Sequence, residues 1–220
     1  KLPTEVIDLP SKGLLYPKDN PLSEGKIELK YMTAKEEDIL SNSSYIRQGI
    51  VLDKLFKSLI VTKINYNDLL IGDKNAIMIA ARILGYGADY EVEIDGDSHT
   101  IDLTSLDDKP LDKIVKTNEG KNEFSYTLPT SKVDITFKFL THRDEVKITK
   151  ELDGLKKLDK NVTRDLSTRT KHYILSVNGD YESKTIREFV DNTMLARDSR
   201  ALRNYIKSIQ PDVDLSYKIT

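Results

Sequence analysis

Prolines constrain the start of this chain more than any other feature of its sequence. They stand at four nearby positions, Pro3, Pro10, Pro17 and Pro21. Each proline removes an amide donor, fixes its own φ angle and disfavours helix at the residue before it. Residues 1–32 are therefore predicted to be extended, with a short strand where Ile27, Leu29 and Tyr31 alternate with charged residues.

Within this extended part lies the apolar stretch LPSKGLLYP, residues 9–17, which we call the strap. Three of its side chains, Leu14, Leu15 and Tyr16, are candidates for contact with a partner. A proline-stiffened segment loses little conformational entropy on docking. Two interpretations follow, and the sequence leaves both open. These three side chains contact a partner protein, or the strap covers a groove on its own helices.

Helical patterns follow over residues 33–87. Thr33 and Glu36 have the spacing of a capping box, which predicts a short helix through Leu40. A second helix is predicted at about residues 50–61, where one face is apolar. The third, residues 75–84, is apolar nearly all round with Arg82 as its one charged interior residue. Such a helix is expected at the centre of a bundle.

Within residues 88–140 apolar residues recur at every second position, which is the spacing of a β-strand. Tyr90, Val92 and Ile94 alternate with acids before an Asp-Gly turn, and a second alternation follows, which predicts a hairpin. Alternation returns near residues 124–128 and 133–139. We expect one small antiparallel sheet with one face exposed to water.

Helical periodicity returns over residues 141–220. A first helical stripe begins near residue 144, and a second continues through Val177. A capping box at Thr185–Glu188 predicts another helix, and the last helix is predicted at 199–209. The expected fold class is α+β, mainly helical with a small antiparallel β-sheet insertion. The expected parts are an extended N-terminal part (1–32), an N-terminal helical part (33–87), the sheet insertion (88–140) and a C-terminal helical part (141–220).

Composition excludes several classes of function. The 220 residues carry a net charge of −2, so no overall positive charge attracts nucleic acid or an anionic membrane. Cysteine is absent, which excludes disulfides and cysteine-ligated zinc, and no apolar run is long enough for a membrane span. The pattern predicts neither a membrane protein nor one that needs a metal or cofactor.

Motifs for catalysis are also missing. There is no nucleophile elbow, P-loop or dinucleotide fingerprint, and no two histidines have the spacing of a helical zinc site. The three histidines are predicted to be surface or half-buried residues, and they are His99, His142 and His172. We expect a protein that is not an enzyme.

The last predicted helix carries one electrostatic feature. Arg200, Arg203 and Lys207 fall within one narrow arc, opposite an apolar side. This arc is either a solvated face or a contact for an acidic partner surface or for nucleic acid. A single basic stripe on a net-acidic protein, without interleaved aromatic residues, argues only weakly for nucleic acid.

Several segments together, in this order, resemble one protein family. They are LPSKGLLYP, GKIELKYMTAKEEDIL (25–40), QGIVLDKLF (48–56), ILGYGADYEVEI (83–94) and DSRALRNYIKSIQPDVDL (198–215). The chain is similar to the baseplate hub subunit and hub-assembly proteins of T4-like contractile-tailed bacteriophages. Some phage relatives with this pattern carry a Cys-x-x-Cys pair after the strand that corresponds to Glu91–Ile94. Here Asp95–Ser98 stands in its place, which excludes a zinc ribbon.

The resemblance implies a non-enzymatic hub component or hub-assembly factor that acts through protein–protein contacts. Its expected partners are other hub and tail proteins or a second copy of the chain, in the virion baseplate or in the host cytoplasm during assembly. The candidate contact residues are those of the strap and of the basic arc, Leu14, Leu15, Tyr16, Arg200, Arg203 and Lys207. The alternative function is a phage nucleic-acid-binding regulator that uses the last helix.

Overall fold

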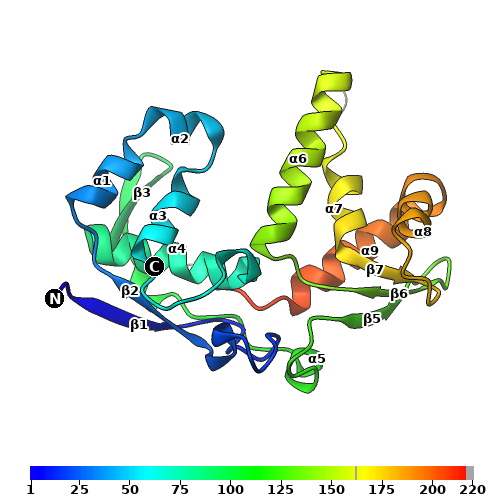
Figure 1. Cartoon of the computed structure of the whole chain (residues 1–220), viewed down its shortest axis with the longest axis horizontal. Coiled ribbons are helices and arrows are strands. Elements are labelled where there is room, and N and C mark those ends of the chain that lie inside the picture. The colour runs from blue at the N-terminus through cyan, green and yellow to red at the C-terminus, as the bar shows by residue number, and fades with distance from the viewer. Residues whose placement is uncertain (162, 217–220) are drawn as a thin grey trace.

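The chain forms two groups of helices that stand on a layer of short strands (Figure 1). The computed structural model describes residues 1–161 and 163–216. The strands are β1 (Thr4–Asp8), β2 (Lys26–Lys30), β3 (Asp89–Ile94), β4 (Asp97–Asp102), β5 (Phe124–Thr127), β6 (Asp134–Phe137) and β7 (Ile174–Val177). The α-helices are α1 (Ala34–Leu40), α2 (Ser43–Gln48), α3 (Val51–Leu59), α4 (Ile71–Tyr86), α5 (Lys113–Thr117), α6 (His142–Leu158), α7 (Asp165–Tyr173), α8 (Ser183–Glu188) and α9 (Ala196–Ile209). Shorter turns are η1 (Pro21–Glu24), η2 (Tyr66–Asp68), η3 (Leu103–Ser105) and the π-helical η4 (Phe189–Thr193).

The expected single sheet insertion is wrong. Helices make up 48% and strands 19% of the structure, and the strands form three separate antiparallel sheets, so the fold is a mixed α+β fold. β1 pairs with β2, β3 pairs with β4, and β5, β6 and β7 form the third sheet. The reason is that the predicted sheet at 88–140 divides after β4, because β5 pairs with β6, and β6 pairs on its other side with a strand from far along the chain and not with the hairpin.

That distant strand, β7, corrects a second expectation. Residues up to Val177 were predicted to be helical, yet α7 ends at Tyr173 and the next four residues pair with β6. Ile135 lies opposite Val177, and Phe137 opposite Ile174. Of the predicted C-terminal helical part, Val162 and residues 217–220 lie outside the described residues.

Of the two capping boxes predicted from the sequence, one is present and one is not. The box at Thr33 is confirmed, because the Glu36 carboxylate accepts the Thr33 amide at 2.8 Å. The box predicted at Thr185 is wrong, because α8 begins two residues earlier and the Thr185 hydroxyl donates instead to Asp180. A box that the sequence analysis missed stands at Thr141, where the Asp144 carboxylate accepts the Thr141 amide.

The strap folds back on its own chain through a tight turn at residues 11–14. The Leu14 amide donates to the Ser11 carbonyl at 3.1 Å, and Lys12 and Gly13 both have positive φ angles, 53° and 74°. A turn with two left-handed central residues favours glycine. A side chain on Gly13 would overlap the backbone of Ser23, so this position also needs glycine for space.

A buried carboxylate holds the strap in place. Asp73, in the first turn of α4, accepts hydrogen bonds from the Ser11 amide (2.9 Å), the Ser11 hydroxyl (2.6 Å) and the Tyr16 hydroxyl (2.6 Å). The Tyr16 oxygen in turn accepts the Leu70 amide at 2.9 Å. Burial raises the pKa of Asp73, and the hydrogen bonds from Ser11 and Tyr16 oppose that rise.

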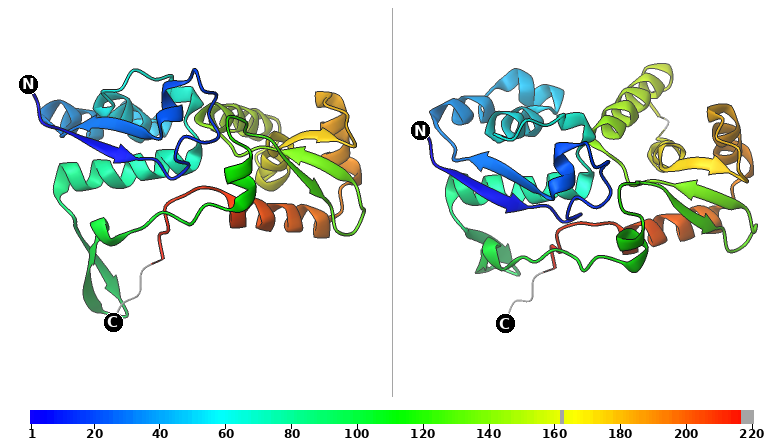
Figure 2. Two further views of the ribbon diagram at one scale, coloured as in Figure 1. Left: turned by 90° about the horizontal axis from the view of Figure 1, so that it is seen from below. Right: turned by 60° about the horizontal axis from the view of Figure 1, so that its bottom comes forward.

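The helix α4 is fully buried on one face only, which differs from the expected central helix of a bundle. Asp73, Ile77 and Ala81 are buried, while Met78, Ile79 and Arg82 on the other face are half-buried. Figure 2 shows the β3–β4 hairpin standing away from the rest of the chain beyond the end of α4. Among the described strands these two pair only with each other, and Tyr90 and Ile101 leave an open groove beside the half-buried face of α4.

The segment after α9 closes the fold under α4. Val213 forms an antiparallel bridge with Asp108, and the Lys109 amide donates to the Asp212 carbonyl at 2.9 Å. A Cβ on Gly72 of α4 would overlap the Pro211 carbonyl oxygen, so glycine permits this close approach. No helix in the described ranges is long and apolar enough to cross a membrane.

Candidate functional site

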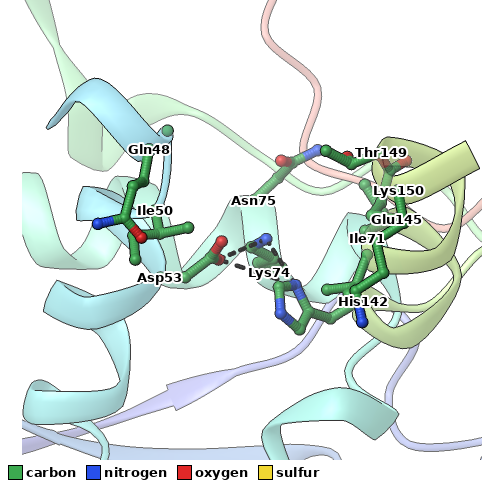
Figure 3. Close-up of a pocket in the computed structure, with 12 residues that line it drawn as sticks. Gln48, Ile50, Asp53, Ile71, Lys74, Asn75, His142, Glu145, Thr149 and Lys150 are labelled. Carbon is green, nitrogen blue, oxygen red and sulfur yellow. Dashed lines mark hydrogen bonds and ion pairs between the residues drawn. The ribbon is translucent and has the colours of Figure 1, made fainter. Parts of the chain in front are cut away.

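A cleft of about 540 Å³ opens between α2 and α3 on one side and α6 on the other (Figure 3). The first turn of α4 forms its floor. The lining residues are Gln48, Gly49, Ile50, Asp53, Ile71, Lys74, Asn75, His142, Glu145, Val146, Thr149 and Lys150. They come from segments far apart in the sequence, so the cleft exists only in the folded chain.

A polar network at the floor joins the two walls. Lys74 of α4 lies 2.6 Å from the Asp53 carboxylate of α3 and 3.1 Å from Nδ1 of His142 on α6. The Tyr66 hydroxyl donates to the same Asp53 carboxylate at 2.5 Å, and its ring meets the His142 ring edge-on at 4.6 Å. Figure 3 shows Asp53, Lys74 and His142 pointing toward one another.

The neighbouring groups determine the protonation states of the side chains in this network. Burial and the positive charge of Lys74 lower the pKa of His142, so its imidazole is neutral near pH 7 and Nδ1 accepts from the Lys74 ammonium. Burial opposes ionisation of Asp53, but hydrogen bonds from Lys74 and Tyr66 outweigh it and lower the pKa of Asp53. Burial, with the hydrogen bond to Asp53, raises the pKa of Tyr66.

This network works as an electrostatic link between helices. The Asp53 carboxylate, the Lys74 ammonium and the His142 Nδ1 atom are all occupied by one another or by Tyr66. Such mutual pairing is typical of a buried structural network, and it gives the cleft a preorganised floor. His142 is buried, whereas the sequence predicted a surface or half-buried residue. The capping box at Thr141 could have placed His142 at the first position of a helix, but its burial comes from Tyr66 and Lys74, which lie far away in the sequence.

The walls of the cleft are partly apolar. Ile50, Ile71 and Val146 line it beside the charged side chains of Glu145 and Lys150. Val146 is 37% exposed. A surface that mixes exposed apolar side chains with charged ones is typical of a contact for another protein.

The strap residues lie elsewhere, and two of them are covered by their own chain. Leu15 and Tyr16 are 2% and 5% exposed, and Leu14 is half-buried with its carbonyl accepting the Gly120 amide. This burial agrees with the second interpretation, in which the strap covers its own helices. In this structure Leu15 and Tyr16 present no surface to a partner.

The predicted basic arc is present on α9. Arg200 and Lys207 are exposed, and the half-buried Arg203 donates to the Ser199 hydroxyl at 2.7 Å. The opposite side buries Leu202, Ile206 and Ile209. Within the described ranges no carboxylate pairs with the three cations, and no hydrogen bond or ion pair joins α9 to the strap. The structure therefore does not bring the two predicted contact sets together.

Asp198, at the start of α9, is a structural residue that the sequence analysis did not identify. It is fully buried and accepts the amides of Thr130 (2.8 Å) and Ser131 (3.0 Å) in the β5–β6 turn. Burial would raise the pKa of Asp198, but these hydrogen bonds outweigh it and lower the pKa. This contact fixes α9, and with it the basic arc, against the three-stranded sheet.

A search of the described residues for a metal site finds no group of three or more acidic, histidine or cysteine side chains placed to hold an ion. The comparisons with known proteins add no family. No protein-family model matches the chain. A search of curated proteins and a search of solved structures also find no match.

Proposed function

We propose that this chain is a non-enzymatic component or assembly factor of a bacteriophage baseplate hub, acting through protein–protein contacts. The observation that carries the proposal is the open cleft between α2–α3 and α6, which combines apolar walls with a preorganised polar floor. The resemblance of the segments at 9–17, 25–40 and 198–215 to hub proteins supports the phage assignment. The partners would be other hub or tail proteins or a second copy of the chain, in the virion or in the host cytoplasm during assembly.

The geometry of the cleft favours a protein segment as its occupant. Its floor is held by Asp53, Lys74 and His142, so a partner that docks there does not have to order these side chains. The exposed Val146 on one wall and Ile50 on the other can be buried by an apolar anchor, while Lys150 at the margin can pair with a partner carboxylate.

The experiment compares two substitutions on the same helix. Val146→Lys places a charge in the cleft, whereas Leu158→Lys changes a side chain at the end of α6 that is 85% exposed. Each variant is co-expressed with baseplate hub and tail proteins of a contractile-tailed phage, and complexes are measured by affinity capture and quantitative mass spectrometry. We expect Val146→Lys to weaken capture about tenfold or more with an unchanged Tm, and Leu158→Lys to leave capture intact.

Mass spectrometry of purified virions and of baseplate intermediates tests the location. We expect the chain in at least one of them. Equal capture by both variants would contradict the role of the cleft, and absence of the chain from virions and intermediates would contradict the hub assignment.

A second candidate function is a nucleic-acid-binding regulator. The observation that favours it is the unpaired basic arc, which Arg197 extends by one further exposed cation on α9. DNA affinity measured across salt concentrations tests it. This function would be supported if the affinity for DNA falls steeply as salt rises and if this dependence is weaker in a variant that carries both Arg200→Glu and Lys207→Glu. An affinity for DNA that is weak even at low salt would contradict it.

A further inference from the structure

The half-buried face of α4 forms one side of a second, apolar groove. The groove has a volume of about 450 Å³ and lies between α4, the hairpin and the segment after α9. Its lining residues are Met78, Ile79, Arg82, Tyr90, Ile101, Leu103, Leu106 and Leu215. A helix that is apolar nearly all round is ordinarily covered all round, yet Met78, Ile79 and Arg82 of α4 are only half-buried beside this open groove.

Arg82 stands unpaired in this apolar setting. The structure gives its guanidinium no hydrogen bond and no ion pair among residues 1–161 and 163–216, and its Nη1 atom is shielded from solvent. The guanidinium carbon lies 5.0 Å from the ring centroid of Tyr86 and 5.6 Å from that of Tyr90. These rings offset part of the cost of desolvation, but an arginine has five donors and ordinarily meets a carboxylate when it leaves water.

The hairpin extends the groove outward along one face. Tyr90, Val92 and Ile94 alternate on this face, and Tyr90 pairs in register with Ile101, which also lines the groove. Tyr90 and Ile94 remain 44% and 43% exposed. An isolated two-stranded hairpin is marginally stable in water, and its outer edges carry backbone groups that no other described strand pairs with.

We propose that this groove binds an extended segment of a partner protein in which one carboxylate side chain is flanked by apolar side chains. The carboxylate pairs with Arg82, and the apolar side chains cover Met78, Ile79 and the apolar face of the hairpin. The assignment depends neither on the cleft nor on the phage assignment, so its test is independent of theirs.

Charge decides the orientation of the partner segment. The reverse face of the hairpin carries Asp89, Glu91 and Glu93, which repel a second carboxylate. Among the residues that line the groove Arg82 is the charged side chain, so a carboxylate is attracted to it, while Asp97, opposite Ile94 in the hairpin, repels a carboxylate at the outer end of the same face. The strand edges beside the groove favour an extended backbone, because such a segment can also form ladder hydrogen bonds.

The probe is a library of random nonapeptides displayed on yeast and sorted against the full chain. A parallel sort uses Arg82→Gln, and Arg47→Gln on α2 is the matched control for loss of an exposed arginine. One enriched peptide is then synthesised with its acidic residue and with the corresponding amide. Affinity is measured by fluorescence polarisation, and Tm is recorded for every variant.

We expect wild type and Arg47→Gln to enrich peptides that have Asp or Glu between apolar residues. The acidic peptide is expected to bind about tenfold more tightly than its amide counterpart, and this ratio should fall to about one with Arg82→Gln. Arg82→Met, which keeps an apolar stem, should lose the same preference while its Tm is unchanged or higher.

Four outcomes of the peptide experiments would overturn the proposal. They are a sort without enrichment, enriched peptides that lack an acid, an acid preference that persists in both Arg82 variants, and peptide binding that appears only after residues 217–220 are removed. Self-association in sedimentation velocity that requires Arg82 would assign the groove to a second copy of the chain and would also overturn it.

Discussion

The Tyr16 hydroxyl lies 2.6 Å from the Asp73 carboxylate and connects the strap to the first turn of α4. The same oxygen accepts the Leu70 amide, so one side chain satisfies a buried acceptor and a buried donor together. The strap is therefore fixed by specific hydrogen bonds as well as by apolar packing. This arrangement explains why a short, irregular segment carries so much apolar surface.

Replacing Tyr16 with Phe is expected to lower the free energy of unfolding by about 1–3 kcal/mol, because the Leu70 amide and Asp73 each lose a partner without access to water. Urea denaturation measures the change. Tyr31→Phe is the control, because the Tyr31 hydroxyl meets Glu5 at an exposed position and its loss should cost less than about 0.5 kcal/mol. Equal effects of the two substitutions would contradict the role of Tyr16.

Replacing Gly72 with Ala is expected to displace the segment after α9, because the new methyl group would overlap the Pro211 carbonyl. We expect a loss of about 1–3 kcal/mol and faster limited proteolysis beyond residue 209. Gly154→Ala on α6 is the control, since nothing lies within 4 Å of its Cβ position. There the substitution should stabilise the chain by about 0.5–1 kcal/mol. Unchanged proteolysis of Gly72→Ala would contradict the close approach.

Glu36 is expected to make unfolding sensitive to acid. Burial would raise its pKa, but hydrogen bonds from Lys30, Thr33 and Ser58 outweigh burial and lower the pKa to about 2. A carboxyl whose pKa is lower in the folded state stabilises the fold above its unfolded pKa of about 4.3, and this contribution is lost as pH falls toward 2.

Glu36→Gln should therefore cost about 3 kcal/mol at pH 7 and should flatten the fall in stability below about pH 4.5. Glu37→Gln is the control, because Glu37 is exposed. It should leave the stability at pH 7 and the fall in stability at low pH near those of wild type. Chemical denaturation from pH 2 to pH 7 measures the effect. An acid-dependent slope that is the same in Glu36→Gln and wild type would contradict the assignment.

His142 is expected to act in a different pH range. Burial and Lys74 lower the pKa of His142 in the folded state below its unfolded value of about 6.5. Its neutral form therefore stabilises the fold above pH 6.5, and this contribution is lost as pH falls through the folded pKa. His142→Gln should remove the part of the loss in stability that occurs between pH 7 and pH 5, as measured by Tm in that range. A slope that survives the substitution would contradict the lowered pKa of His142.

The sequence predicted those elements whose pattern is local and failed where a distant partner decides the structure. The helices near residues 51–59 and 196–209 and the hairpin at 89–102 follow from periodicity, turns and caps. β7 could not be found in this way, because Ile174–Val177 continues an apolar helical spacing and becomes a strand only by pairing with β6.

Short polar helices and buried networks were the other failures. α2 has no buried residue, and its signals are the Asn42 cap at its start and Gly49 in left-handed conformation after its end. Lys74 and His142 meet 68 residues apart in the chain, and no local pattern encodes that meeting. The sequence did identify the Arg82 position on α4 and the basic arc on α9, because both stand out from their own helix.

The bridge between Val213 and Asp108 also has a consequence for biosynthesis. A nascent chain can build the strap, α1–α4 and the hairpin early, but the space beneath α4 stays open until Pro211 and Val213 have left the ribosome. Completion of the fold therefore waits for the segment after α9, and products truncated before Pro211 would be left with a persistently open underside that chaperones and proteases can recognise.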